Sequence, residues 1–189
     1  DIYCEGITEI TVEDMKYAKA MGTTIKLLAS SKRMGKRLHA IVAPCMLYPE
    51  HPLYNVNDVF NAIFVHGNVL GDAMFYGSGA GKLPTASAVV ADVVDCAKNK
   101  GRNIMMSWSE EKLNLLQIDD VKSRFFVRVS GHAAERQSEI EELFGKVEIV
   151  AVPSLSEEFA FITGEITEQE YREKAEKLDG IQSRIRARI

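Results

Sequence analysis

Apolar side chains recur with the spacing of an α-helix in four stretches of the chain, so the sequence predicts four helices. In the first and the fourth stretch, a threonine is followed three residues later by an acidic residue, a pair typical of a capping box at a helix start. Gly22 and Gly180 are expected to end these two helices. The predicted helices begin at Thr11, at Pro84 or Thr85, near Ala133 and at Thr167.

Continuous or alternating apolar runs between these helices predict β-strands. Two runs flank a basic turn and predict an antiparallel hairpin, whose second strand should end at Pro44. Two further runs flank the turn signal His66-Gly67-Asn68 and predict a second hairpin. The strand candidates are 25–29, 38–43, 59–65, 69–76, 125–129, 147–152, 159–163 and 181–189.

From residue 123 onward the predicted elements run strand, helix, strand, strand, helix, strand, which is the ferredoxin-like βαββαβ order. In the last strand, isoleucines and Ala187 alternate with Gln182 and three arginines, and this pattern predicts a sheet with one wet face. The predicted fold class is α+β, an antiparallel or mixed sheet with helices on one face followed by the βαββαβ unit. The predicted domains are 1–110 and 123–189, joined by a polar linker at 111–122.

Composition narrows the classes of function. A chain of 189 residues that is 46% hydrophobic can bury a core, and its formal charge of −4 arises from 27 acidic and 23 basic residues mixed along the sequence. We therefore expect neither nucleic acid nor membrane as a partner, and a cytoplasmic location. The three cysteines and four histidines show no ligand spacing, so no metal site is predicted.

The segment with most chemical potential is the glycine-rich turn at 77–81, between a predicted strand and a predicted helix. Such a turn leaves backbone N–H groups available and lets a phosphate or ribose approach the chain closely. The spacing is not that of a dinucleotide-binding fingerprint, because Lys82 and Pro84 follow where glycine or alanine is required. A plain tight turn remains the alternative interpretation.

Residues 1 to about 97 resemble bacterial homoserine dehydrogenases in four blocks of sequence. The first block runs from Glu5-Gly6-Ile7-Thr8 to Ile25-Lys26-Leu27-Leu28-Ala29. The second includes His51-Pro52-Leu53 and Asn55 to Ala62, and the third is Gly71 to Gly77. The fourth joins Gly79-Ala80-Gly81 to Leu83-Pro84-Thr85-Ala86-Ser87-Ala88-Val89-Val90-Ala91-Asp92.

This resemblance implies an oxidoreductase that reduces aspartate semialdehyde to homoserine with NADP or NAD as cofactor, on the route to threonine, methionine and isoleucine. It implies cofactor contact at Gly79, Ala80 and Gly81. The family's proton-transferring lysine stands four residues after an aspartate, and no aspartate of this chain has a lysine at that spacing. We therefore expect the catalytic residues and the dinucleotide domain upstream of Asp1, and no activity from the chain alone.

Three other charged residues have sequence positions that bear on this expectation. Lys26 is interpreted as a solvated or interface lysine, because strand alternation turns it away from Ile25 and Leu27. Lys82 flanks the candidate loop and is interpreted as a surface charge. Glu5 either approaches an active site or hydrogen-bonds a turn.

Residues 123–189 resemble the ACT domain found in part of this family, which implies a possible amino-acid effector at the turn 131–136. The Pro-Gly of the family pattern is missing from that turn, so a degenerate ACT domain kept for oligomerisation is an equal alternative. Exposed sheet edges favour a homodimer or higher homo-oligomer. The alternative for the whole chain is a free-standing ACT-type sensing or oligomerisation module without catalysis.

Overall fold

The computed structural model describes residues 2–102 and 105–188. They form two compact units, one made of residues 1–54 and 113–189 and the other of residues 55–112. This grouping joins the first 54 residues to the C-terminal part of the chain, whereas the sequence placed them in one domain with residues up to 110. The division into 1–110, 111–122 and 123–189 stays a prediction.

The first unit begins with short β1 (Tyr3–Cys4) and helix α1 (Val12–Ala20). The capping box is confirmed: the Thr11 hydroxyl accepts from the Asp14 backbone N–H, and the Asp14 carboxylate accepts from the Thr11 N–H at 2.8 Å. Gly22, with φ of 67°, follows the last turn and releases the chain from the helix as predicted.

The predicted hairpin of β2 (Thr24–Met34) and β3 (Arg37–Leu47) is confirmed, but its strands are longer than expected. The prediction that Pro44 ends the second strand is wrong. Pro44 pairs with Leu27 and lies between Val42, the last β3 residue paired with β1, and Cys45, the first paired with β11. A proline is tolerated at such an interruption of the ladder because neither β1 nor β11 pairs with it on the side away from β2.

The predicted βαββαβ unit is present in the C-terminal part. Its four main strands lie in the order β11-β7-β9-β8, with neighbours antiparallel, and helices α3 and α4 make the two crossovers. The elements are β7 (Lys122–Ser130), α3 (Ala133–Phe144), β8 (Glu148–Val150), β9 (Glu158–Ile162), α4 (Glu168–Ala175) and β11 (Ile181–Arg188). Three short elements accompany them: β6 (Asn114–Leu115), the 3-10 helix η1 (Ile118–Asp120) and β10 (Ile166–Thr167).

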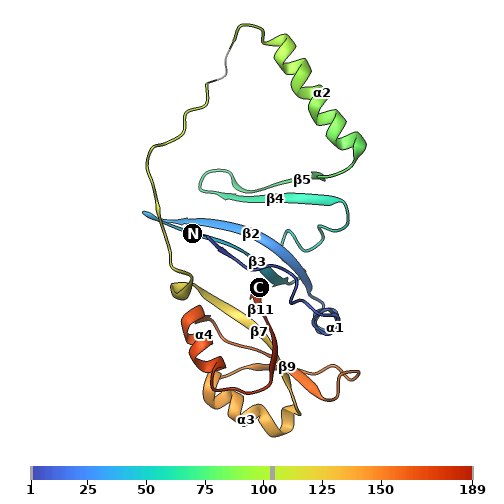
Figure 1. Cartoon of the computed structure of the whole chain (residues 1–189), viewed down its shortest axis with the longest axis vertical. Coiled ribbons are helices and arrows are strands. Elements are labelled where there is room, and N and C mark those ends of the chain that lie inside the picture. The colour runs from blue at the N-terminus through green and yellow to red at the C-terminus, as the bar shows by residue number, and fades with distance from the viewer. Residues whose placement is uncertain (1, 103–104, 189) are drawn as a thin grey trace. The chain divides into compact units, whose positions relative to one another are not determined.

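One mixed sheet connects the two ends of the chain in this unit. Strand β11 pairs with β3 in parallel, with Arg186 opposite Cys45, so the sheet runs on from the βαββαβ strands into the N-terminal hairpin (Figure 1). The fold class is therefore α+β, as predicted, built on a mixed sheet.

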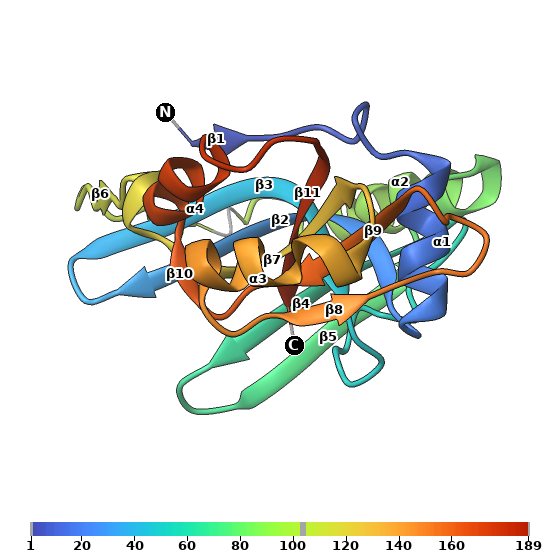
Figure 2. The same cartoon turned by 90° about the horizontal axis from the view of Figure 1, so that it is seen from below.

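Both faces of the sheet are covered. Phe125, Val127 and Val129 of β7 point to a core completed by α3 and α4, which lie over that face (Figure 2). Phe126, between them in sequence, points to the other face and packs with Tyr17 of α1, whose ring centroid is 5.7 Å away. A strand buried on both faces explains why β7 is apolar at nearly every position.

The prediction of a wet face on the last strand is wrong. The register of β11 against β7 shifts between Ile181 and Ser183, so Ile181 packs against the core under α3 and α4 while Ile185 packs on the opposite face with α1. Arg184 and Arg186, which were expected in solvent, bind Glu5 and Glu168, and Arg186 is 3% exposed. A β-bulge changes which face each following side chain takes, and a strict two-residue alternation does not reveal it.

The second unit contains the hairpin of β4 (Phe60–Gly67) and β5 (Gly71–Ser78), followed by helix α2 (Lys82–Lys98). The predicted hairpin is confirmed, but its turn comes later than His66-Gly67-Asn68: both His66 and Gly67 belong to β4, and Val69 is 92% exposed in the turn. Helix α2 begins at Lys82, before Pro84, because the first N–H groups of a helix have no intrahelical partner and proline is accepted there.

Helix α2 has no buried residue among those described, and its valines at 89, 90, 93 and 94 are exposed. No helix in the described ranges is long and apolar enough to cross a bilayer. Within residues 2–102 and 105–188, no group of three or more His, Cys, Asp or Glu side chains is placed to hold a metal ion.

Tyr171 on α4 generates a prediction about alkaline pH. Its ring packs on Phe125 with centroids 4.5 Å apart, and burial raises the pKa of its hydroxyl from 10.0 to about 12. The folded state disfavours the phenolate. The contribution of Tyr171 to the free energy of unfolding should therefore be fully present below about pH 10 and be lost as the pH rises through about 12. Tyr171→Phe should lessen that fall by ~2 kcal/mol.

Urea unfolding followed by circular dichroism at several alkaline pH values measures this difference. Tyr76→Phe, at an exposed tyrosine of β5, is the matched control and should leave the pH dependence unchanged. Equal pH dependence in wild type and Tyr171→Phe would contradict the prediction.

Candidate functional site

The predicted site residues Gly79, Ala80 and Gly81 form the exposed connection between β5 and α2. The backbone N–H of Gly79 donates to the Val59 carbonyl at 3.2 Å, which fixes the beginning of the connection against the start of β4. Gly81 is the N-cap of α2 and has φ of 121°, a conformation that side chains with a Cβ rarely adopt. The three residues therefore make one short glycine-rich loop that opens a helix of 17 residues.

The start of α2 is electrostatically suited to an anion. No side chain caps the helix at Gly81, and its first turn contains no acidic residue. Lys82, exposed at the first helical position, adds a positive charge beside the unpaired backbone N–H groups of the first turn. A helix N-terminus of this kind favours a phosphate or another negative group through its dipole and its backbone donors.

The other charged residues weighed from the sequence lie apart from this loop in the chain. Lys26 is half-buried on β2, where it pairs with Cys45. Glu5 follows β1 and binds two arginines of β11, at 3.2 Å to Arg184 and 2.7 Å to Arg186. These contacts are ion pairs with a strand, whereas the sequence suggested either an active site or the hydrogen bonding of a turn.

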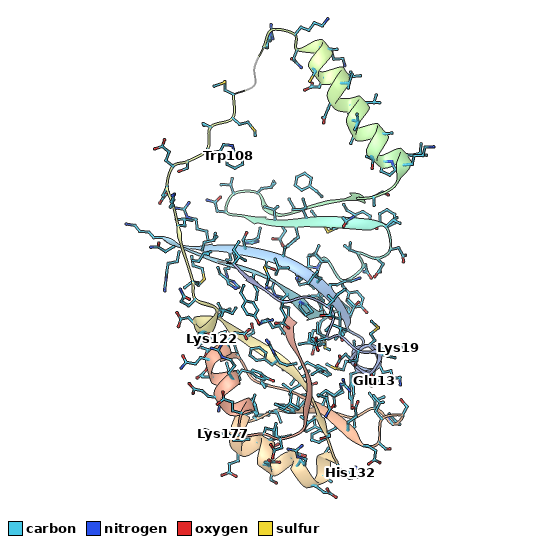
Figure 3. All side chains as sticks on the ribbon, in the orientation of Figure 1. Glu13, Lys19, Trp108, Lys122, His132 and Lys177 are labelled. Atoms are coloured by element: carbon cyan, nitrogen blue, oxygen red, sulfur yellow. The ribbon has the colours of Figure 1, made fainter. Side chains whose placement is uncertain are left out.

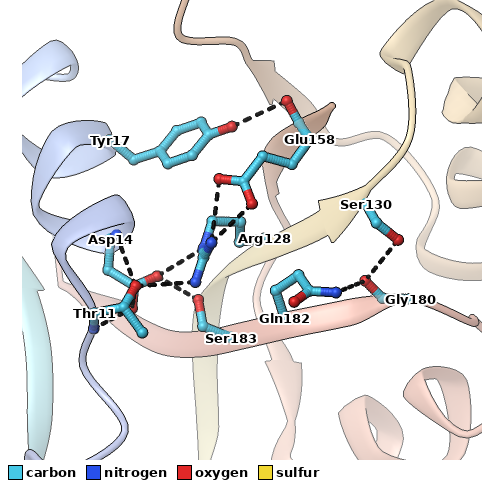
Figure 4. A network of polar contacts seen from close by, with 9 residues as sticks. All are labelled: Thr11, Asp14, Tyr17, Arg128, Ser130, Glu158, Gly180, Gln182 and Ser183. Carbon is cyan, nitrogen blue, oxygen red and sulfur yellow. Dashed lines mark hydrogen bonds and ion pairs between the residues drawn. The ribbon is translucent and has the colours of Figure 1, made fainter. Parts of the chain in front are cut away.

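A buried ionic network joins α1 to the βαββαβ strands (Figure 4). Its centre is Arg128 of β7, 5% exposed, whose Nε lies 3.1 Å from Asp14 and whose Nη1 lies 2.8 Å from Glu158. Its Nη2 donates to the Thr11 hydroxyl at 3.0 Å, and the Ser183 hydroxyl of β11 donates to Asp14 at 2.5 Å. One arginine thus contacts the cap of α1 and the start of β9, while Ser183 brings in β11.

Asp14 has two functions in this network. It is the acidic member of the α1 capping box, and it is also the buried counter-ion of Arg128, with none of its surface exposed. A buried charge is tolerated only when it is paired and hydrogen-bonded, and Asp14 meets that condition through Arg128, Ser183 and its own helix cap. The position of α1 therefore depends on residues more than a hundred positions later in the chain.

A second network lies under α4. Glu168, at the start of α4, accepts from Arg186 at 2.5 Å and from Arg184 at 3.3 Å, and Glu5 binds the same two arginines. Burial by itself would lower the pKa of Arg186, but the hydrogen bonds to Glu168 and Glu5 outweigh it and hold that pKa above its ordinary value. The Arg186 guanidinium also lies over the Tyr3 ring, at 5.3 Å from its centroid.

An apolar pocket of about 620 Å³ lies beside α1 in the first unit. The Tyr54 hydroxyl donates to the Gly22 carbonyl at 3.1 Å, and both residues line the pocket. Lys19 of α1, labelled in Figure 3, also contributes to the lining. The apolar side chains that form the rest include Ile7, Ile10, Met15, Ala18 and Ile25.

In the turn at residues 131–136, where the sequence suggested an amino-acid effector, the Arg136 side chain makes hydrogen bonds within the protein. Arg136 donates to the Ser130 carbonyl at 2.9 Å and to the Asp179 carbonyl at 3.0 Å, and it pairs with Glu139. Gly131 has φ of 101° in this turn, and His132 precedes α3 (Figure 3). Arg136 thus ties the β7–α3 turn to the turn before β11.

Sequence reasoning found the glycine loop but missed both ionic networks. The signal was partly visible: Arg128 stands in an otherwise apolar strand, where an ion needs a partner. The partner's identity was not visible, because Asp14 and Arg128 are 114 positions apart.

Replacing Arg128 tests how strongly this network holds the first unit together. Arg128→Met keeps the length of the side chain but leaves the Asp14 carboxylate buried without its counter-ion, so the free energy of unfolding should fall by about 3–5 kcal/mol. The double variant Asp14→Asn/Arg128→Met removes both charges and should regain part of that loss. Urea unfolding measures the three proteins.

Arg172→Met is the matched control, because Arg172 and Asp119 form an exposed ion pair worth at most about 1 kcal/mol. If Arg128→Met costs no more than Arg172→Met, the network does not hold α1 to the sheet.

Comparison with known proteins places these features in a family. The homoserine dehydrogenase family model matches residues 1–94. The chain is 38% identical over 133 residues to a homoserine dehydrogenase of Bacillus subtilis, and this match covers 68% of this chain and 30% of that protein. It is 50% identical over 105 residues to the homoserine dehydrogenase of Corynebacterium glutamicum, and this match covers 53% of this chain and 24% of that protein.

Solved structures agree. A homoserine dehydrogenase from Thiobacillus denitrificans matches 97% of this chain with a TM-score of 0.77 and 27% identity, and the match covers 47% of that chain. One from S. aureus matches the whole chain with a TM-score of 0.73 and 25% identity, over 48% of its own length. The chain spans about a third or less of the curated relatives and about half of these solved chains. By sequence over residues 1–94 and by fold over nearly its whole length, the chain belongs to the homoserine dehydrogenase family.

Proposed function

We propose that this chain is the part of an NAD(P)-dependent homoserine dehydrogenase that follows the dinucleotide domain and the catalytic lysine, and that the enzyme interconverts aspartate semialdehyde and homoserine in the cytoplasm. The observation that carries the proposal is the loop Gly79-Ala80-Gly81 at the start of α2, within the segment that matches the family. A free-standing ACT-type module is not favoured, because the family match lies outside the βαββαβ unit.

The residues of this loop fit a nicotinamide dinucleotide in three respects. The loop is exposed, its last residue, Gly81, lacks a Cβ, and it ends at a helix N-terminus without an acidic side chain. Bound there, the cofactor supplies the hydride that reduces the substrate carbonyl. The contribution of this chain is to hold the cofactor through loop backbone N–H groups and the α2 dipole, while Lys82 adds positive charge nearby.

NADP and NAD are both compatible with this proposal. The ribose phosphate that distinguishes them is recognised by the dinucleotide domain, which we place outside this chain. Pathway membership follows from the reaction: homoserine is the expected precursor of threonine and methionine.

The βαββαβ unit is proposed to be an ACT domain. Its effector turn is closed by Arg136, which binds the carbonyls of Ser130 and Asp179, and this favours a role in assembly over amino-acid sensing. We further propose a homodimer or higher homo-oligomer. The exposed valines of α2 and the exposed Ile63 and Phe75 of the β4–β5 hairpin support it, because an extensive exposed apolar surface marks an interface.

The first test is activity. The chain of residues 1–189 alone should show no NAD(P)-dependent oxidation of homoserine above background. The reason is that no lysine of this chain follows an aspartate at the four-residue spacing of the family's proton-transferring lysine. A longer polypeptide that adds the dinucleotide domain and catalytic helix should turn over, as followed by the absorbance of the reduced cofactor. Turnover by the 189-residue chain would contradict the proposed division of roles.

The second test concerns Gly81 in the longer enzyme. Gly81→Val places a branched side chain at φ of 121°, so it should displace the start of α2 and raise the KM for the cofactor by on the order of tenfold or more. Val69→Ala, in an exposed turn, is the control and should leave the cofactor KM unchanged. Unchanged kinetics in a folded Gly81→Val protein would return this loop to the role of a plain turn.

A further inference from the structure

The hairpin register places Asn61 of β4 directly opposite Gly77 of β5. Residues opposite each other in an antiparallel pair share one face of the sheet. Two residues after Gly77, and just beyond the end of β5, comes Gly79, which lies diagonal to Asn61. Two glycines therefore lie across the hairpin from Asn61, one opposite and one diagonal, and the second of them begins the candidate cofactor loop.

The two glycines differ in what surrounds them. A Cβ added at Gly79 would lie 1.8 Å from Nδ2, 2.6 Å from Cγ and 3.1 Å from Cβ of Asn61, so the Asn61 carboxamide would have to leave its present position before a larger residue could stand at 79. A Cβ added at Gly77 meets no atom within 4 Å. Gly79 does not have a positive φ, so its own backbone conformation does not require glycine.

We infer that Asn61 is a positioning residue of the candidate cofactor loop, and that Gly79 is glycine because of Asn61 and not because a cofactor must approach it. The inference rests on the proposed function only for what the loop binds. The Asn61 carboxamide packs on the Gly79 backbone from one side, while the hydrogen bond from Gly79 N to the Val59 carbonyl holds the same residue to the start of β4. These two contacts fix where the loop leaves the sheet.

The three loop residues thereby have separate requirements. Gly81 needs glycine for its φ of 121° at the helix start. Gly79 needs it for the Asn61 side chain, and Ala80 between them carries a Cβ.

A double-mutant cycle in the longer enzyme tests this. Gly79→Ala should raise the dissociation constant of the reduced cofactor, measured by its fluorescence on binding, by on the order of tenfold. Asn61→Ala alone should raise it by about threefold while kcat at saturating cofactor stays within about twofold, because the loop is less well placed but the chemistry is intact.

Combining the two substitutions should relieve the overlap. In Asn61→Ala/Gly79→Ala the nearest remaining atom is the Cβ of residue 61 at 3.1 Å, which a shift of a few tenths of an ångström accommodates. Its dissociation constant should return to within about threefold of that of Asn61→Ala alone. Gly77→Ala, at the glycine two residues earlier in β5, is the matched control and should bind as the wild type does.

The outcomes separate the inference from the proposed function. If the double variant binds no better than Gly79→Ala, the cofactor itself excludes a side chain at 79, and the role given to Asn61 is wrong. If none of these variants nor Gly81→Val changes cofactor binding, the loop does not bind the cofactor. In that case the midpoint temperatures of thermal unfolding still decide. If Gly79→Ala lowers the midpoint and the added Asn61→Ala restores it, the packing of Asn61 on Gly79 is supported. If the two substitutions lower the midpoint additively, the packing is overturned.

Discussion

The guanidinium of Arg128 is the point at which the two ends of the first unit meet. It pairs with Asp14 at the cap of α1 and with Glu158 at the start of β9, while Ser183 of β11 donates to the same Asp14 carboxylate. A buried ion pair of this kind adds little net stability compared with apolar residues of similar size, yet removal of one partner is costly. Its effect is to specify one position for α1, because apolar packing of Tyr17 and Ala18 alone would tolerate small displacements.

The continuous sheet depends on that placement. Strand β3 pairs with β11 in parallel, and α1 covers the face that the βαββαβ unit leaves without helices. The outer edge of β11 is therefore occupied within the chain, which leaves the three-residue β8 as the edge of the βαββαβ part. Association through the proposed ACT domain would have to use that short edge or the helical face, and a short edge strand is a weak template for pairing.

The sequence was most informative where the determinant is local. Both capping boxes, the hairpins and the βαββαβ order follow from residues a few positions apart, and the structure contains them. Predictions failed where a distant partner decides. Pro44 continues a strand because neither β1 nor β11 pairs with it, and Arg186 of β11 is buried because Glu5 and Glu168 pair with it. A bulge near Gln182 then reversed the faces, and nothing in the alternation of the strand announces it.

The glycine loop combines both situations, and this is why its residues were found but their reasons were not. Glycine spacing is local, so the segment from Gly77 to Gly81 stood out in the sequence and its place between a strand and a helix was predicted. The reason for each glycine is geometric: Gly81 requires a positive φ, Gly79 requires room for Asn61 across the hairpin, and Gly77 requires neither. Glycines in one motif thus answer to different neighbours, and a hairpin register is needed before a motif can be divided into backbone, packing and ligand requirements.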